Sequence, residues 1–163
     1  MARIRKRLGE MLIEASLLTR EQLEENLAEQ VKSGMKLGEY LIHKGVFEEE
    51  QIVDLISRQL KIGKFDPDEI EIDETAAETI KPEFARQYNL APVQKKNHLL
   101  LVAMVDPMDI NAIDSVEILT NLEVETIICT EQQLRDLMAR IYGLPERIGG
   151  MLGGMLDEMD MDE

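Results

Sequence analysis

The sequence lacks several features that particular classes of protein require. It has a single cysteine, Cys129, so no disulfide can form within the chain, which suits a reducing compartment. No apolar run reaches the roughly 18 residues of a membrane span, and the amino-terminal residues lack the apolar core of a secretory signal. We therefore expect a cytoplasmic protein without direct membrane insertion.

Aromatic and basic residues are also scarce. Aromatics make up 4% of the chain and tryptophan is absent, so aliphatic and methionine side chains must form the core. The 18 lysines and arginines stand against 33 acidic residues, and the net charge is −15. Binding to a nucleic acid polymer needs a basic stripe that neutralises phosphates, so the composition argues against that class. Only Arg3–Arg7 (RIRKR) is locally basic.

Motifs for catalysis, metal binding and nucleotide triphosphate binding are missing as well. The glycine-rich GGMLGG, residues 149–154, is not followed by a lysine with serine or threonine, so it cannot act as a P-loop. His43 and His98 lie far from each other and from Cys129 in the sequence, which gives neither a zinc motif nor a Cys–His pair. We predict a chain that is not an enzyme, holds no cofactor or metal, and buries Cys129 in its core.

What the sequence does contain is a repeat of 24 residues. Arg7–Gln30 (RLGEMLIEASLLTREQLEENLAEQ) returns 29 positions later as Lys36–Gln59 (KLGEYLIHKGVFEEEQIVDLISRQ), with eight identical positions and no gap. In each copy the apolar residues follow helical spacing. Residues 1–61 therefore predict a bundle of four short helices in two repeated pairs.

Local signals mark the ends of these helices. Thr19 and Gln22 have the spacing of a capping box, and Gly34 is suited to end the helix that follows. Gly45 separates the two helices of the second copy. The apolar residues at these spacings, among them Leu27 and Val31, are expected to pack between helices.

The second half of the chain has a different pattern. Residues 62–72 form a linker by composition, and residues 73–143 predict a small unit of helices with a sheet of about three strands. The strands are expected within residues 90–105 and at 124–129, and the last helix is expected to open with a capping box at Thr130 and Gln133. The fold class is therefore α+β. Residues 144–163, rich in glycine, methionine and acids, predict a flexible tail or, alternatively, a helix that docks elsewhere.

The repeat and part of the second half resemble a known family. The pattern RLGxxLIxxSLLxxxxLxxxLxxQ, the spacer VKSGM and the pattern KLGxxLIxxGVFxxxxIxxxIxxQ are similar to the tandem motif of the MshEN domain. Residues 80–143, with the turn AMVDPMD, are similar to the rest of that domain. Such domains stand at the amino end of the hexameric ATPases that drive type II secretion and type IV pilus assembly, and no ATPase module with Walker motifs is present in this chain.

The resemblance implies a ligand and a site. In the family's ligand-binding members the two motifs together hold cyclic di-GMP, whose two similar halves suit a duplicated unit. Glycine lets a backbone approach a ligand closely, arginine or lysine can bind guanine or phosphate, and the glutamine amide can both donate and accept. The site residues that the resemblance implies are Arg7, Leu8, Gly9, Leu12, Leu23, Leu27, Gln30, Lys36, Leu37, Gly38, Leu41, Ile52, Ile56 and Gln59.

Two departures from the motif keep a second hypothesis open. Ser16 stands where the first motif has glycine, and Lys36 stands where the second motif has arginine. The apolar site residues would also be needed for helix packing alone. The alternative is therefore a module for protein–protein interaction, which docks the ATPase on an inner-membrane platform protein without binding nucleotide.

Overall fold

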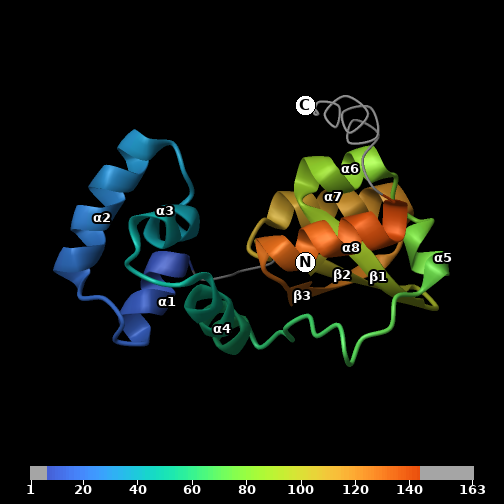
Figure 1. Cartoon of the computed structure of the whole chain (residues 1–163), viewed down its shortest axis with the longest axis horizontal. Coiled ribbons are helices and arrows are strands. Elements are labelled where there is room, and N and C mark those ends of the chain that lie inside the picture. The colour runs from blue at the N-terminus through green and yellow to red at the C-terminus, as the bar shows by residue number, and fades with distance from the viewer. Residues whose placement is uncertain (1–6, 144–163) are drawn as a thin grey trace, which may run out of the picture.

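The computed structural model describes residues 7–143, so residues 1–6 and the predicted tail, residues 144–163, lie outside the described range. Within it the fold class is α+β, as predicted, with helices first and a three-stranded sheet after them (Figure 1). The helices are α1 (Leu8–Glu14), α2 (Arg20–Ser33), α3 (Leu37–Lys44), α4 (Glu49–Leu60), α5 (Glu74–Ala77), α6 (Pro82–Tyr88), α7 (Ile110–Thr120) and α8 (Glu131–Tyr142). The strands are β1 (Leu90–Lys96), β2 (Leu99–Met104) and β3 (Glu123–Ile128).

The two sequence repeats fold as structural copies. After α1 the N–H groups of Leu17 and Leu18 both donate to the Leu12 carbonyl, at 2.9 and 3.4 Å. After α3 the N–H groups of Val46 and Phe47 donate to Leu41, at 3.0 and 3.4 Å, 29 positions later in each case. Because the backbone bonds repeat as well as the residues, each copy is the same helix–turn–helix unit.

The predicted ends of the helices are confirmed. Thr19 Oγ1 accepts from the Gln22 N–H at 3.1 Å, and Gln22 Oε1 accepts from the Thr19 N–H at 3.0 Å, which is a complete capping box. Gly34 follows α2 in the left-handed conformation with φ of 77°. Thr130 and Gln133 form the second predicted capping box, at the start of α8. Each of these ends is therefore fixed by local chemistry.

The sheet combines two kinds of pairing. Strands β1 and β2 pair antiparallel as a hairpin, and β2 and β3 pair parallel through the crossover helix α7, in the order β1-β2-β3. The cluster on one face packs the sheet against α6 and α7, with Val102 and Ile113 fully buried. The cluster on the other face packs it against α8 and the segment after α4, with Val93 and Cys129 fully buried. Burial of Cys129 was predicted.

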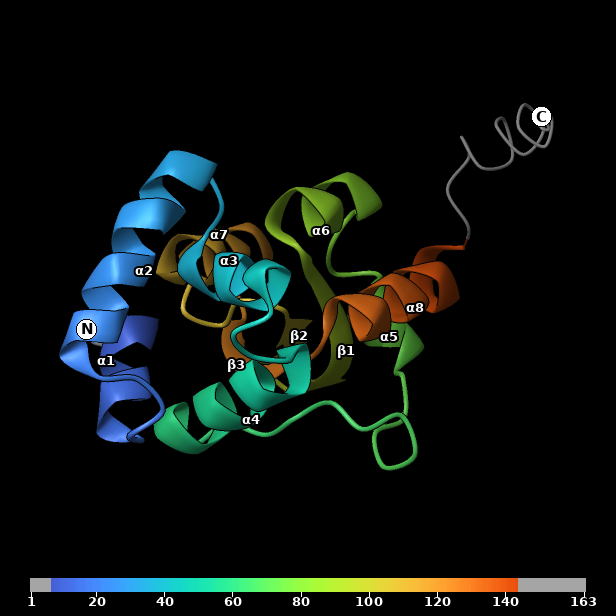
Figure 2. The ribbon, with the colours of Figure 1, turned by 60° about the vertical axis from the view of Figure 1, so that its left-hand side comes forward.

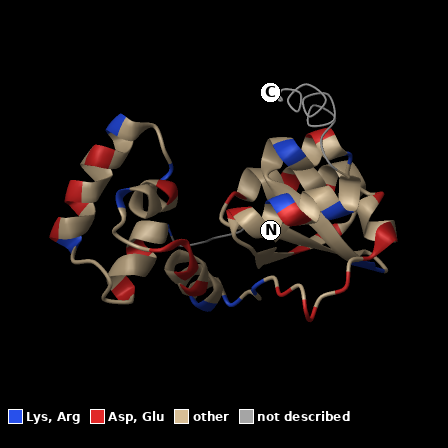
Figure 3. Ribbon diagram, in the orientation of Figure 1, with Lys and Arg blue, Asp and Glu red and all other residues tan. Residues whose placement is uncertain are grey.

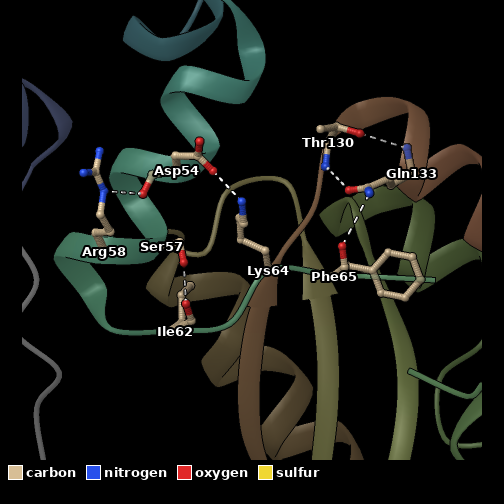
Figure 4. Close-up of polar contacts among 8 residues, drawn as sticks. All are labelled: Asp54, Ser57, Arg58, Ile62, Lys64, Phe65, Thr130 and Gln133. Atoms are coloured by element: carbon tan, nitrogen blue, oxygen red, sulfur yellow. Dashed lines mark hydrogen bonds and ion pairs between the residues drawn. The ribbon is translucent and has the colours of Figure 1, made fainter. Parts of the chain in front are cut away.

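The segment between the two halves is tied down at its start. Lys64 forms a parallel bridge with Ile128, whose N–H donates to the Gly63 carbonyl at 2.9 Å. Figure 4 shows Lys64 reaching Asp54 on α4 at 2.6 Å, and the Phe65 carbonyl accepting from the Gln133 side chain at 3.4 Å. Figure 2 shows the chain running on from α4 beside the sheet towards α5. The segment therefore connects both halves through bonds as well as through the chain.

The expected packing of α2 is only partly correct. Leu23 is buried, at 6% exposed, but Leu27 is 36% exposed and Val31 is 73% exposed. The reason is visible in Figure 1, where α2 lies at the outer edge of the helical half and the other helices cover only part of its length. The periodic pattern identified the helix correctly and overestimated the length of its buried face.

Candidate functional site

The two motifs begin in the same backbone conformation. Arg7 and Lys36 are the N-cap residues of α1 and α3, with φ and ψ of −79° and 153° for Arg7 and of −70° and 158° for Lys36. Both residues are exposed. Each is followed by leucine and glycine in the first helical turn, so the matched basic side chains start from matched positions on the two units.

The two glycines have a packing role. A Cβ on Gly9 would lie 3.1 Å from both δ carbons of Leu23, and a Cβ on Gly38 would lie 3.2 Å from a δ carbon of Leu8. Such distances are shorter than ordinary carbon contacts, so a side chain would force its neighbour to move. Close packing of Leu23 on α1 and of Leu8 on α3 therefore favours glycine at these positions, whatever ligand the motif binds.

The predicted apolar site residues divide by burial. Those buried in the helical core are Leu8, Leu12, Leu23, Leu41, Ile52 and Ile56, while Leu37 is half-buried and Leu27 is exposed. The glutamines also differ. Gln30 donates from Nε2 to the Met35 carbonyl at 2.6 Å, whereas Gln59 is half-buried and its side-chain amide makes no hydrogen bond within residues 7–143. Gln30 therefore holds the spacer between the repeats by a hydrogen bond, whereas the side-chain amide of Gln59 can bond to a ligand.

One cavity, of about 370 Å³, lies at the junction of the two halves, and we call it the junction cavity. It brings together some of the predicted site residues, namely Leu8, Lys36, Leu37, Gly38, Ile52 and Ile56. All of these except Leu8 belong to the second motif. The remaining predicted residues, Arg7, Gly9, Leu12, Leu23, Leu27, Gln30, Leu41 and Gln59, do not line it.

The α/β half supplies the opposite wall of the junction cavity. Its contribution includes Asp106, Met108 and Asp109 from the turn before α7, with Glu131 at the start of α8. These residues were not predicted as site residues. The AMVDPMD turn was noted for its resemblance alone, and nothing in the spacing indicated that it would face Lys36, some 70 positions earlier. Only the folded chain brings the two segments together.

The walls of the junction cavity are strongly acidic. Among the residues that the structure describes, five carboxylates line it, from Glu39, Glu49, Asp106, Asp109 and Glu131, against the single ammonium of Lys36. Figure 3 shows acidic segments at the start of α4 and in the loop before α7, on the sides of the two halves that face each other. The described part of the lining therefore carries net negative charge.

Lys36 links the two halves directly. Its Nζ donates to Asp106 Oδ2 at 2.8 Å, with side-chain exposures of 68% and 30%. The hydrogen bond to the Asp106 carboxylate raises the pKa of Lys36, although burial acts in the opposite direction. A second bond crosses the junction where Glu49 Oε2 accepts from the Glu131 N–H at 2.9 Å. Lys36 is therefore charged and already paired.

Other chemistry is not indicated in the described part of the chain. Residues 7–143 contain no group of three or more His, Cys, Asp or Glu side chains placed to hold a metal ion. Within the same range no helix is long and apolar enough to cross a bilayer. Cys129 lines the cavity but is fully buried, and burial raises the pKa of its thiol to about 12. Its thiolate is therefore scarce at neutral pH, unlike that of a reactive cysteine.

Known proteins share this fold and part of this sequence. The type IV pilus assembly ATPase PilB of Myxococcus xanthus (strain DK1622) is 30% identical over 136 residues, which are 83% of this chain and 24% of PilB. The chain thus spans about a quarter of that relative's length.

Solved structures agree over nearly the whole described range. A structure of MshE with cdg superposes with a TM-score of 0.76 at 30% identity and covers 85% of this chain and 100% of that chain. The N-terminal domain of XpsE superposes with a TM-score of 0.68 at 24% identity, covering 86% of this chain and 100% of that one, which supports the fold.

A family model described as the MshEN domain matches residues 58–148, more than half of the chain. Its match lies mainly over the α/β half, whereas the structural superpositions extend over the repeats too. Together these findings show that the chain belongs to the MshEN domain family.

Proposed function

We propose that this chain is the non-enzymatic regulatory domain of a secretion or pilus ATPase, and that it binds cyclic di-GMP through its two repeated units. The observation that carries the proposal is the structural duplication, because a ligand with two similar halves can be held by two similar units. The likeness to MshE, whose structure contains cdg, an abbreviation of cyclic di-GMP, supports the choice of ligand. The domain would act in the cytoplasm.

In this proposal the basic residues that begin the motifs bind the ligand. The exposed Arg7 guanidinium can form two parallel bonds with a guanine edge or a phosphate. Lys36 offers a point charge in place of the planar fork, and its ammonium already donates to Asp106. That ion pair is partly exposed, so displacing it costs about 1 kcal/mol, whereas micromolar binding supplies about 8 kcal/mol. The ion pair therefore weakens ligand binding without preventing it. Gln59, with a free amide, is the proposed counterpart from α4.

Calorimetric titration with cyclic di-GMP tests this proposal. We expect micromolar binding to the wild-type chain, and a loss of about 5- to 150-fold in Arg7→Ala, since a bidentate contact contributes about 1–3 kcal/mol. Gln59→Ala should also weaken binding. The matched controls are Arg20→Ala and Gln132→Ala, which remove the same side chains from exposed positions of α2 and α8. No binding heat with a folded wild-type chain would contradict the proposal.

A second function is favoured by one observation, the acidic junction cavity. Five carboxylates beside the second motif repel a dianion, whereas they do not oppose the docking of a protein. The alternative is therefore an interaction module that docks on an inner-membrane platform protein or on the ATPase module without nucleotide. It predicts no calorimetric response to cyclic di-GMP and an unchanged thermal transition in its presence.

A further inference from the structure

We propose that the open end of the sheet, on the face that carries α8, binds a segment of a partner protein with apolar and basic side chains. A hollow of about 540 Å³ lies there, bounded by the three strands and the segment before α5, and we call it the sheet-end hollow. None of its lining residues belongs to the repeats. The proposal therefore goes beyond nucleotide binding and does not rest on it, and its test involves no nucleotide.

Strand β2 has the composition of a strand that is covered on both faces. Its sequence, LLLVAM, is a continuous apolar run, whereas a strand with one open face alternates apolar and polar residues. Side chains of a strand point alternately to opposite faces. Leu99, Leu101 and Ala103 thus face the side of α8, and Leu100, Val102 and Met104 face the side of α6 and α7. The sequence of β2 predicts a cover on both sides along its whole length.

The fold supplies that cover completely on one face only. The three residues on the side of α6 and α7 are all buried, but on the other face burial decreases along the strand. Ala103 is fully buried, Leu101 is half-buried and Leu99 is 36% exposed. On β3, Ile127 beside Ala103 is buried and Glu125 beside Leu101 is exposed. Helix α8 thus covers one end of this face, and Figure 1 shows β1 and β2 continuing past it.

The floor of the sheet-end hollow is apolar and its outer wall is held in place. Leu99, Leu101 and Ile72 contribute the apolar side chains. The segment that carries Ile72 is bonded to β1, since the next residue, Asp73, donates its N–H to the Val93 carbonyl at 2.8 Å. Apolar side chains of a partner would be removed from water on a surface that already exists in the free chain.

The charge of the sheet-end hollow decides what kind of segment fits. Among the described residues its lining holds four carboxylates and two lysines. Glu71, Glu74 and Glu125 are exposed, and their side chains make no hydrogen bond or ion pair within the part of the chain that the structure describes. Lysine or arginine side chains beside an apolar anchor would meet these charges. Residues 144–163 hold six acids and one base, so they are not the favoured occupant.

A labelled peptide provides the test. The probe is a short acetylated and amidated peptide of alternating lysine and leucine, which in extended form presents all its leucines on one face. Fluorescence anisotropy should show saturable binding that weakens as salt is added. The control peptide carries glutamate in place of lysine and should not bind. In a methyl spectrum, the Leu99 and Leu101 signals should shift on binding, and that of Leu37, which lines the junction cavity, should not.

Variants with effects of opposite sign locate the interaction. Glu125→Gln should weaken peptide binding about two- to fivefold, the range for one exposed ion pair, and Lys96→Gln should strengthen it by a similar factor. Leu99→Ala should weaken binding at least about fivefold, as for an apolar anchor. The controls Glu24→Gln on α2 and Ile118→Ala on α7 remove an exposed charge and an exposed apolar side chain outside the hollow, and should have no effect.

Several results would overturn the proposal. It is wrong if neither peptide binds, if both bind equally, if the Leu37 signal shifts while those of Leu99 and Leu101 do not, or if the controls weaken binding as much as the hollow variants. Residues 2–6 of this chain are themselves basic, so a variant without them is titrated with the same peptide. Equal affinity in the full and shortened chains supports a partner segment. Tighter binding to the shortened chain would assign the hollow to the chain's own amino-terminal residues and contradict the proposal.

Discussion

The turn in the first repeat is predicted to become more stable when serine is replaced by glycine. Ser16 has φ of 60°, in the left-handed region, and its equivalent Gly45 has φ of 84°. Holding an L-residue in this conformation costs about 1–2 kcal/mol, which glycine avoids. Glycine loses more conformational entropy on folding, and this lowers the stability by about 0.5–1 kcal/mol. The net expectation for Ser16→Gly is a gain of about 0.5–1 kcal/mol in the free energy of unfolding.

The second repeat provides the reciprocal change. A Cβ on Gly45 would have no atom within 4 Å, so Gly45→Ser adds backbone strain without a steric clash. It should lower the free energy of unfolding by a similar amount, about 0.5–1 kcal/mol. Because both turns make the same backbone bonds, the two substitutions should have opposite signs and comparable size.

Urea unfolding followed by far-ultraviolet circular dichroism measures both effects. For a domain of this size, 1 kcal/mol corresponds to a shift of about 2–4 °C in Tm, which a thermal scan resolves. The control is Ser115→Gly within α7, where glycine should destabilise by up to about 1 kcal/mol. If Ser16→Gly lowers stability as Ser115→Gly does, the strain assigned to this turn is wrong.

Three further predictions concern packing, charge and the thiol. Leu23→Ala should cost about 2–5 kcal/mol, because Leu23 is buried over Gly9. Leu27→Ala on the same helix should cost less, about 1 kcal/mol, because Leu27 is 36% exposed. Equal losses in urea unfolding would contradict the packing described for α2. The Lys36 pKa is raised in the folded chain, so its contribution to stability is present below the ordinary value of 10.5 and is lost as pH rises through the folded value. Asp106→Asn keeps the oxygen that accepts from the Met108 N–H and removes the charge that pairs with Lys36. The loss of unfolding free energy at alkaline pH, under about 1 kcal/mol for such a pair, should disappear in this variant. An unchanged pH profile would argue against the ion pair. The Cys129 thiol, with its pKa raised to about 12, should react with a thiol reagent at pH 8 only when urea unfolds the chain, and rapid labelling of the folded chain would show that the core opens there.

Local patterns predicted local structure well. The capping boxes at Thr19 and Thr130 and the stop at Gly34 were read correctly, because each depends on residues within one turn of the helix. The repeat predicted two equivalent units, and the shared backbone bonds confirm them.

Contacts between distant segments could not be predicted in this way. Nothing in the sequence indicated that Lys36 meets Asp106 or that Glu49 caps the start of α8, since these pairs form only when the halves pack together. The glycines illustrate a different limit. Gly9 and Gly38 were assigned to ligand contact, and their neighbours Leu23 and Leu8 give them a packing reason that no spacing rule supplies. The assignment of the site residues to a nucleotide stays a prediction.

Ile128 has a consequence for mechanics. It ends β3, its main chain exchanges bonds with Gly63 and Phe65 of the connecting segment, and its side chain packs in the core of the helical repeats. A single residue thus anchors the sheet, the connection and the bundle. A force or torque applied to the repeats would consequently be transmitted to the sheet through these bonds and this packing. We therefore expect the repeats and the sheet to move together and to unfold in one cooperative step.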